Sequence, residues 1–473
     1  MSILTRYKTV RRSSARASTA MLVAAIAGCS LEVADPEVVD PGDLNTVEAL
    51  PTLLAGAIGD FKLAYSGSGG NTEGIILAGG MRADEWLNAD TFDTRQEMDR
   101  GIVRESNASN QGLFRNMQQA RLSAEFAGRR FAALAPAQAG HAEVKALAGF
   151  TYVLFGENYC SGVPFSSFDG SGNLVYGDPL TTAQMLQRAI VLFDSALAIA
   201  APGTRNHHLA SIGKARALLD LDRDNAAAAA ALVGAVPTTF VYNIEHSENT
   251  TAQNNGVFFL NNINRRWSVA ENEGGNGLNF RSANDPRVPV ARLLSASGAP
   301  RIGLDNRTPL FAQFKYESRS ASIPLATGVE ADLIEAEAAL AAGDVTTFIG
   351  ALNALRANTA LYRCPLNPPP NYTCPGALAP IVLTGTETTT QLENLLFRER
   401  AFWMFSTGHR LGDLRRLARP TAEGGYGRAY NSVFPTGPYH KGGAPYGPEG
   451  SFLVPVDERN NPRYPGSCDN QGA

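Results

Sequence analysis

Two segments of the chain, residues 82–99 and 261–281, place a tryptophan among hydrogen-bonding side chains outside any regular helical pattern. A flat aromatic ring beside Asp, Asn and Arg side chains is typical of a site for sugar rings, whose apolar C–H faces are edged by hydroxyl groups. The candidate ligand-binding residues are Asp84, Trp86, Arg95, Trp267 and Asn279.

Packing in the core is the competing interpretation for both tryptophans, because large aromatic side chains are highly buried on average. If Trp86 or Trp267 binds a ligand, at least one of them must be exposed in a concavity. Two buried tryptophans would exclude the assignment and leave the tyrosines of residues 420–446 as the aromatic candidates.

A further concentration of charge, residues 395–416, reads LLFRERAFWMFSTGHRLGDLRR. Its first half has the aromatic stripe of a helix, and charged residues at helical spacing follow. The arginines could form an anion site or a buried ion-pair network. Because the segment supplies its own opposite charges in Glu399, Arg410 and Asp413, we expect a network that fixes the angle between two helices, with Arg416 as a further structural residue.

Motifs of catalysis and metal binding are absent from the sequence. It contains no GxSxG elbow, no HExxH pair and no Walker loop. Asp220, Asp222 and Asp224 have the spacing with which a calcium loop begins, but Asn225 replaces its glycine and Ala231 its glutamate. We therefore expect no metal, no cofactor and no enzymatic activity, although two carboxylates brought together by folding would still permit a hydrolase.

Alanine-rich segments with apolar residues every three to four positions predict a helical protein. The predicted helices are residues 111–134, 141–158, 181–200, 206–221, 225–235, 329–342, 345–358 and 388–406. Short polar turns join some neighbours, as in tetratricopeptide units, whose paired helices stack on one another. The Gly343-Asp344 turn is so short that residues 329–358 should form an antiparallel helix pair.

Residues 1–28 have the features of a secretory signal, since they carry five basic and no acidic residues and contain the short apolar run AMLVAAIA. The segment Ile26-Ala27-Gly28-Cys29 resembles the bacterial lipobox, which predicts that Cys29 is lipidated and becomes the new N-terminus. Residues 29–45 then form a lipidated, flexible tether, and residues 46–473 form a single domain. The alternative is a soluble secreted protein in which Cys29 occurs there by chance.

The formal net charge is −4, and removal of residues 1–28 with their five basic residues makes it −9. An acidic protein lacks the basic surface that nucleic acids require, so no nucleic-acid partner is expected. Ser30, rather than an acidic residue, follows the lipidation site and favours the outer membrane over the inner one. The predicted location is therefore the outer membrane, reached through an N-terminal lipid.

Four cysteines remain once Cys29 is assigned to a lipid, and in an exported protein an even number suggests disulfides. The four permit three connectivities. Cys364 and Cys374 bracket the proline-rich loop PLNPPPNYT, where local pairing is the closure of lowest entropic cost. The second predicted disulfide, Cys160 with Cys468, rests on subtraction and on the loop location of both residues.

The segment of residues 395–416 resembles the C-terminal hallmark of the SusD/RagB family. The matching residues are Arg398-Glu399-Arg400, Thr407-Gly408-His409-Arg410 and Asp413-Leu414-Arg415-Arg416. Thr407 stands where the family has an acidic residue, so the bond made by that carboxylate is not expected here. Further stretches similar to the family, in the expected order, are residues 143–164, 284–287, 330–356 and 455–462.

The resemblance implies an all-α fold of tetratricopeptide-like helix pairs in one superhelical domain, with long irregular loops packed on one side. It also implies a non-enzymatic lipoprotein at the cell surface. Such a protein captures a glycan or peptide nutrient and delivers it to a SusC-like, TonB-dependent transporter in the outer membrane.

Two other functions stay open. A tetratricopeptide-type adaptor lipoprotein without a small ligand would place its binding residues on concave helix faces, and a surface hydrolase would gather two carboxylates in a deep cleft. Residues 160–180, 237–325 and 420–473 form long loops rich in Gly, Asn, Pro and aromatic residues. Because long loops of this kind often carry function, they favour a ligand-binding protein.

Overall fold

The computed structural model of the chain describes residues 43–70, 72–169, 171–362 and 364–469. The predicted signal segment 1–28 and the lipidation site Cys29 lie outside these residues, as does the tether up to residue 42. The chain divides into two units, residues 1–49 and 50–473. The described part of the first unit contains the short 3-10 helix Asp43–Asn45, and the second unit contains the other described helices and strands.

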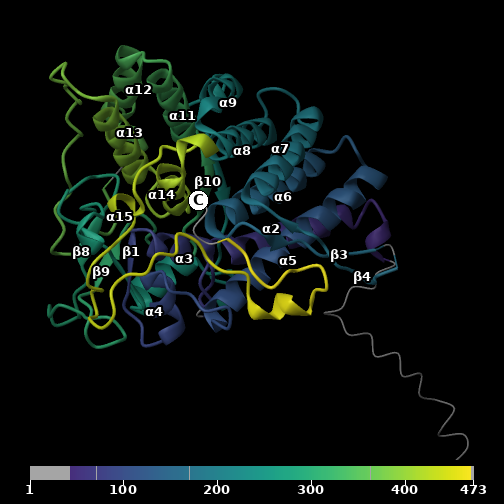
Figure 1. Cartoon of the computed structure of the whole chain (residues 1–473), viewed down its shortest axis with the longest axis horizontal. Coiled ribbons are helices and arrows are strands. Elements are labelled where there is room, and N and C mark those ends of the chain that lie inside the picture. Colours follow the sequence, from purple (N-terminus) through teal and green to yellow (C-terminus); the bar gives the residue numbers. More distant parts are fainter. Residues whose placement is uncertain (1–42, 71, 170, 363, 470–473) are drawn as a thin grey trace, which may run out of the picture. The chain divides into compact units, whose positions relative to one another are not determined.

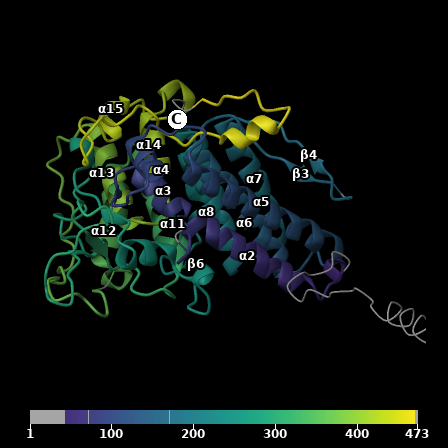
Figure 2. The same cartoon turned by 90° about the horizontal axis from the view of Figure 1, so that it is seen from below.

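An array of stacked helices forms the main body of the second unit. Its members are α2 (Leu50–Ser66), α5 (Ala108–Leu134), α6 (Ala139–Asn158), α7 (Thr182–Ile199), α8 (Arg205–Leu221), α9 (Ala226–Val233), α11 (Gly328–Ala341) and α12 (Val345–Ala357). Helix α2 packs on α5, each helix from α5 to α8 packs on the next of the array, and α11 packs on both α9 and α12 (Figure 1, Figure 2). The predicted all-α fold of tetratricopeptide-like helix pairs is confirmed.

Small residues let neighbouring helices of the array approach closely around the ring of Phe193. A Cβ atom added to Gly149 of α6 would lie 2.8 Å from this ring, and one added to Gly213 of α8 would lie 2.3 Å from it. Phe150 adds an edge-to-face contact, with 5.1 Å between the ring centroids. Glycine is therefore a steric requirement where α6, α7 and α8 pack around one buried ring.

Helices α11 and α12 contact each other as the hairpin predicted for residues 329–358. Gly343 between them has a φ of +76°, a left-handed conformation that glycine adopts without strain. Asp344 then caps α12, because its side chain accepts a hydrogen bond from the backbone N–H of Thr347 at 2.9 Å.

The remaining α-helices are short, apart from α13. They are α3 (Ile75–Arg82), α4 (Asp93–Arg100), α10 (Gly256–Phe258), α13 (Thr389–Trp403), α14 (Arg410–Ala418) and α15 (Tyr430–Val433). No helix in the described part of the chain combines the length and the apolar character that crossing a bilayer requires.

The described strands form five two-stranded antiparallel sheets. The pairs are β1 (Trp86–Asn88) with β7 (Trp267–Val269), β2 (Val163–Pro164) with β5 (Pro179–Leu180), β3 (Ser167–Phe168) with β4 (Leu174–Val175), β6 (Val241–Ile244) with β10 (Ile323–Thr327), and β8 (Val290–Arg292) with β9 (Phe311–Gln313). The loops that carry β1 and β7 to β9 pack with α3 and α4 on one side of the array (Figure 1).

Two disulfides join loops, and both have the pairing predicted from the sequence. Cys160 pairs with Cys468 at a Cα–Cα distance of 5.7 Å, and Cys364 pairs with Cys374 at 5.6 Å. Both distances lie within the range that a disulfide spans. The first bond ties the end of α6 to the C-terminal tail, and the second closes a local loop.

Buried charges surround helix α14. Asp413 accepts a hydrogen bond from Arg400 of α13 at 3.0 Å and one from Arg416 at 3.3 Å. Arg416 also pairs with Glu337 of α11. These side chains are each at most 5% exposed, so three helices are held together by ion pairs in the interior.

Arg410 makes its ion pair outside the segment of residues 395–416. Its guanidinium donates to both carboxylate oxygens of Asp84, at 2.6 and 2.8 Å. Glu399 instead accepts from Arg287 and Arg356, each at 2.7 Å. The predicted mutual network of Glu399, Arg410 and Asp413 is therefore wrong in its partners. Asp413 does pair within the segment, with Arg400 and Arg416, but Arg410 pairs with Asp84 in the loop before β1, and Glu399 pairs with Arg287 and with Arg356 of α12.

The Asp84–Arg410 pair gives a direct test of this interior. Replacing Arg410 by Ala leaves the fully buried carboxylate of Asp84 without its cation, so the free energy of unfolding should fall by about 3–5 kcal/mol. Lys214→Ala breaks the solvent-exposed pair with Asp194 and should cost less than about 1 kcal/mol. Urea unfolding measures both, and equal losses would contradict the assigned role of Asp84–Arg410.

Candidate binding groove

Both tryptophans proposed as ligand platforms are buried, and that prediction is wrong. Trp86 and Trp267 are each 0% exposed. They lie on the paired strands β1 and β7, where Trp86 packs against Phe405 at 5.6 Å between ring centroids. Trp267 lies under the guanidinium of Arg95, which is 4.8 Å from its ring centroid. Strands β1 and β7, which pair across nearly two hundred residues of sequence, place both rings in the core. The sequence near each tryptophan does not reveal this pairing.

The other predicted ligand residues do not lie together in one site. Asp84 is fully buried in its ion pair with Arg410, so it is structural. Asn279 is half-buried in the loop before Phe280 and lies away from the groove at the start of α4. Arg95 alone among the predicted ligand residues lines that groove.

The tyrosines of residues 420–446 are not exposed platforms either. Tyr439 and Tyr446 are buried, and their hydroxyls donate to the carboxylates of Asp99 and Glu273 at 2.6 and 2.9 Å. Tyr426 is half-buried and donates to a carboxylate of α11. These rings pack the C-terminal loop against the body of the protein.

An open groove of about 320 Å³ lies where the starts of two helices meet a loop. Its walls are the loop before α3 (Thr72, Glu73), the start of α4 (Phe92, Thr94, Arg95) and the start of α5 (Ala108, Ser109, Gly112, Leu113). Phe92 immediately precedes α4 in extended conformation, and this position turns its ring outward at the edge of the groove. The groove thus combines one aromatic ring with hydroxyl, carboxylate and guanidinium groups.

Phe92 is a rigid, accessible aromatic surface. Half of the residue is exposed, at 50%. The guanidinium of Arg95 lies 4.9 Å from its ring centroid and that of Arg266 lies 5.2 Å from it. Two cations stacked on an aromatic ring hold it in place, so the exposed part of the ring is available to a ligand without a large loss of side-chain entropy.

Beneath the ring, Arg95 and Arg266 are neutralised by carboxylates. Arg95 donates to both oxygens of Glu73, at 2.6 and 3.2 Å, and also pairs with Asp90. Arg266 donates to both oxygens of Asp90, at 2.7 and 2.8 Å. Two cations balance two anions, so the cluster has no excess charge with which to select a strongly charged ligand.

The polar rim joins α4 to α5. The hydroxyls of Thr94 and Ser109 are 2.8 Å apart. The side chain of Asn107 caps α5 by accepting from the backbone N–H of Asn110, and it donates to the carbonyl of Thr94 at 2.8 Å. This cap fixes the spacing of the two helix starts, and the two hydroxyls give a ligand both donors and acceptors.

The geometry suits binding better than catalysis. The carboxylate that lines the groove, Glu73, is held at both oxygens by Arg95, whereas a general acid must carry a proton that it can transfer to the substrate. No group of three or more metal-ligating side chains is found in the described part of the chain. An uncharged ring with apolar faces and hydroxyl edges matches an aromatic surface bordered by hydroxyls.

The exposed aromatic residue of the groove lies in a segment that the sequence singled out, but the sequence drew attention to its tryptophan. Phe92 lies within residues 82–99, six positions after Trp86. The missed signal is the short polar helix α4, whose sequence DTRQEMDR begins with an acidic residue and ends before Gly101 in left-handed conformation. An apolar residue just before a polar helix finds no apolar helix face to pack against. Phe92 therefore stays at the surface.

The sequence matches no protein-family model and no curated protein, but solved structures share its fold. A SusD superfamily protein from Parabacteroides distasonis superposes with a TM-score of 0.63 at 11% identity, covering 88% of this chain and 98% of that one. The surface glycan-binding protein A of Bacteroides uniformis gives 0.60 at 12% identity, covering 90% and 100%. NanU of B. fragilis gives 0.58 at 11%, covering 92% and 100%.

The carboxylate under Phe92 makes the groove sensitive to acid. Burial alone would raise the pKa of Asp90, but the hydrogen bonds and charges of Arg266 and Arg95 outweigh burial and hold the pKa below its ordinary value of 3.8. A lowered pKa contributes stability above pH 3.8 that is lost as the pH falls through the folded-state pKa. Asp90→Asn should therefore reduce the free energy of unfolding by about 3 kcal/mol at pH 7.

The difference between the wild type and Asp90→Asn should narrow below about pH 4, because protonation then removes the same charge from the wild type. Urea unfolding at pH 7, 4 and 3 measures this convergence. Asp93→Asn, a change of the exposed neighbour, should stay within about 0.5 kcal/mol of the wild type. A constant difference at all three pH values would show that Asp90 does not act through its charge.

Proposed function

Because the chain has the fold of the SusD superfamily, we propose that it is a non-enzymatic, lipid-anchored protein of the cell surface that binds a glycan and delivers it to a SusC-like, TonB-dependent transporter. The groove around Phe92 is its ligand site. Proteins with this fold include a surface glycan-binding protein and a SusD-like carbohydrate-binding protein, which supports a glycan as the ligand class.

The observation that carries the proposal is the exposed ring of Phe92 at the edge of a groove with hydroxyl groups. Aromatic rings are costly to expose and are usually buried, yet this one is held outward by two guanidinium groups. Stacking against the C–H face of a sugar gives such a ring an apolar contact, while Thr94 and Ser109 face the sugar hydroxyls. The balanced charges beneath the ring favour an uncharged sugar.

The alternatives find less support. An adaptor would use concave faces of the helix array, whereas this groove is built from a loop and the starts of α4 and α5, of which only α5 belongs to the array. A hydrolase would need two carboxyl groups free to exchange protons across the bound sugar, whereas Glu73 and Asp90 are bound to arginines. The groove is therefore better suited to binding a glycan than to hydrolysing one.

Lipid attachment and transporter delivery rest on the sequence. The lipobox-like segment ending at Cys29 and the acidic stretch that follows it predict an anchor with a tether. A tether of this kind would let a ligand-loaded protein meet a channel in the same membrane at a raised effective concentration. The transporter is the partner that a captured nutrient requires in order to cross the outer membrane.

Replacing Phe92 by Ala tests the ligand site. If the stacking contact is worth about 0.5–1.5 kcal/mol, as for a pair of rings, the Kd for the uncharged oligosaccharide that binds best on a glycan array should rise about two- to tenfold. Phe168→Ala removes a phenylalanine of similar exposure, 54% against 50%, from the β3–β4 hairpin and should leave the Kd unchanged. Isothermal titration calorimetry distinguishes the two.

Equal effects of Phe92→Ala and Phe168→Ala would contradict the assignment of the groove. A parallel peptide array tests the other ligand class. If the protein binds peptides on it and no glycan on the glycan array, the ligand is a peptide. The unfolding midpoint of Phe92→Ala should stay within a few degrees of the wild type, since the ring is half exposed.

The anchor is tested at Cys29. Mass spectrometry of the protein from its native membrane should show a mature N-terminus at Cys29 bearing acyl chains, and Cys29→Ala should move the protein out of the membrane fraction. Ser30→Ala, beside it, should keep both the lipid and the location. A retained Met1, or a mature N-terminus at another residue, would refute lipidation.

A further inference from the structure

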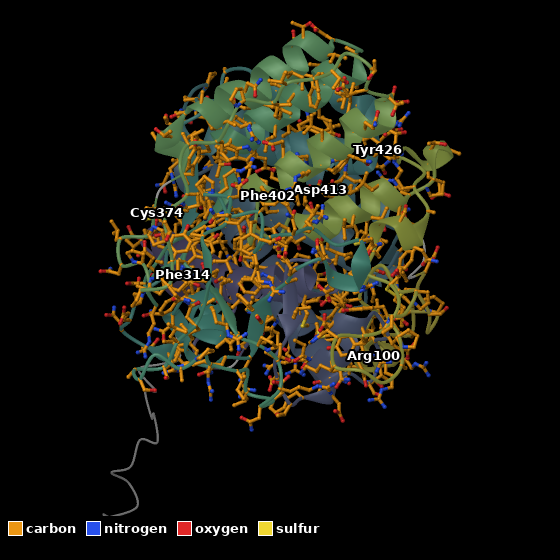
Figure 3. The ribbon with its side chains drawn as sticks, turned by 90° about the vertical axis from the view of Figure 1, so that its left-hand side faces the viewer. Arg100, Phe314, Cys374, Phe402, Asp413 and Tyr426 are labelled. Carbon is orange, nitrogen blue, oxygen red and sulfur yellow. A yellow bond between two sulfur atoms is a disulfide. The ribbon has the colours of Figure 1, made fainter. Side chains whose placement is uncertain are left out.

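A second hollow, of about 180 Å³, lies beneath the loop closed by the Cys364–Cys374 disulfide. Three other segments complete its walls: the loop before β8, the chain after β9 and the end of α13. Its lining includes Arg287, Phe314, Lys315, Leu361, Tyr362 and Trp403. Figure 3 shows Phe314 and Cys374 on the same side of the molecule. None of the residues that line the groove around Phe92 lines this hollow.

Aromatic rings and prolines form most of this lining. Tyr362 and Trp403 lie 5.9 Å apart between ring centroids with their planes tilted by 55°. Phe314 adds a third ring, and Pro286, Pro289 and Pro365 fill the intervals between the rings. Flat rings set at an angle around a hollow offer faces to a ligand from more than one direction, as binding sites for compact ring-shaped molecules do.

The disulfide loop is held in place as the outer wall. The carboxylate of Glu317 accepts hydrogen bonds from the backbone N–H groups of Leu366 and Asn367, each at 3.0 Å. Tyr372 of the loop packs near Phe314, with 6.4 Å between the ring centroids. Asn371 donates to the carbonyl of Arg292 at 2.9 Å. A wall tied at three places, in addition to its disulfide, keeps the hollow formed before any ligand arrives.

The charges at the hollow leave no excess of either sign. Arg287 is neutralised by ion pairs with Asp285 and Glu399, and Lys315 lines the hollow together with the carboxylate of Glu317. The ammonium group of Lys315 donates to the carbonyl of Phe405 at 2.8 Å, and burial lowers the pKa of Lys315 to about 8, so it is still mostly protonated at neutral pH. Arg287 also lies over the ring of Trp403, at 5.0 Å, and occupies the surface that a bound cation would need.

We infer that the hollow beneath the disulfide loop is a second binding site, for one uncharged sugar ring. The rings of Phe314 and Tyr362 contact the C–H faces, and the balanced charges of the hollow give it no excess charge with which to hold a charged sugar. The choice of a sugar rests on the proposed function, whereas the existence of the second site rests on the hollow itself.

Filling the hollow tests the inference. Leu361→Trp places a large ring in it, and Leu340→Trp makes the same change in a hollow of about 150 Å³ beside Tyr426. Both are made in the full chain carrying Phe92→Ala, so that the groove lacks its aromatic surface. Saturation-transfer NMR titrations use methyl β-glucopyranoside, its uronic acid and glucosamine as probes.

The neutral probe should bind the Phe92→Ala chain, with its uronic acid and glucosamine each at least tenfold weaker, because a hollow without excess charge does not repay the desolvation of a charged sugar. Leu361→Trp should weaken binding of the neutral probe at least tenfold, and Leu340→Trp should leave it unchanged. Absence of binding by the neutral probe, equal binding of a charged probe, or equal effects of the two tryptophan substitutions would each overturn the inference. If Leu361→Trp lowers the unfolding midpoint strongly, Phe314→Leu, which removes only one aromatic face, takes its place with the same expected loss.

These outcomes are separable from the test of the proposed function. If oligosaccharide binding fails to depend on Phe92, the groove assignment is lost while the monosaccharide result at Leu361 still stands. If the monosaccharides bind independently of Leu361, the second site is lost and the groove around Phe92 is unaffected.

Discussion

The buried carboxylate of Asp84 is the junction on which the rest of this structure depends. Both of its oxygens accept from Arg410 of α14, and one also accepts from the backbone N–H of Leu278 at 2.9 Å. One side chain thereby connects α14, the segment leading to the groove and the loop after β7. A buried ion pair adds little net stability over apolar packing, but losing one partner is costly. The pair therefore acts by fixing which segments meet.

That junction determines what the surface can offer to a ligand. With β1 and β7 paired in the core, the chain after β1 must emerge at the start of α4, where Phe92 lies half exposed. Arg95 spans the two environments, since its guanidinium lies between the ring of buried Trp267 and that of Phe92. The buried ring of Trp267 thus positions Arg95, which in turn holds the exposed ring of Phe92. A substitution at Trp267 should therefore change the position of Phe92 in the groove.

The sequence predicted the elements that depend on local contacts. Apolar spacing located most helices of the array, and the Gly343-Asp344 turn located the hairpin α11–α12. It did not predict contacts made across long separations. The role of Trp86 depends on pairing with β7 some 180 positions later, and the partner of Arg410 lies 326 positions away. Spacing within 395–416 predicted local ion pairs. Such pairs form at Asp413 with Arg400 and Arg416, whereas Arg410 and Glu399 pair with residues outside the segment.

A crystal structure of the chain with a bound uncharged oligosaccharide tests the central claim most directly. The account predicts a sugar ring packed on the outer face of Phe92, within van der Waals contact of its ring carbons, with sugar hydroxyls at hydrogen-bond distance from Thr94 or Ser109. The structure around Arg95, Glu73 and Asp90 should be unchanged, since the groove is formed in advance. An oligosaccharide bound elsewhere, with Phe92 still in solvent, would contradict the account.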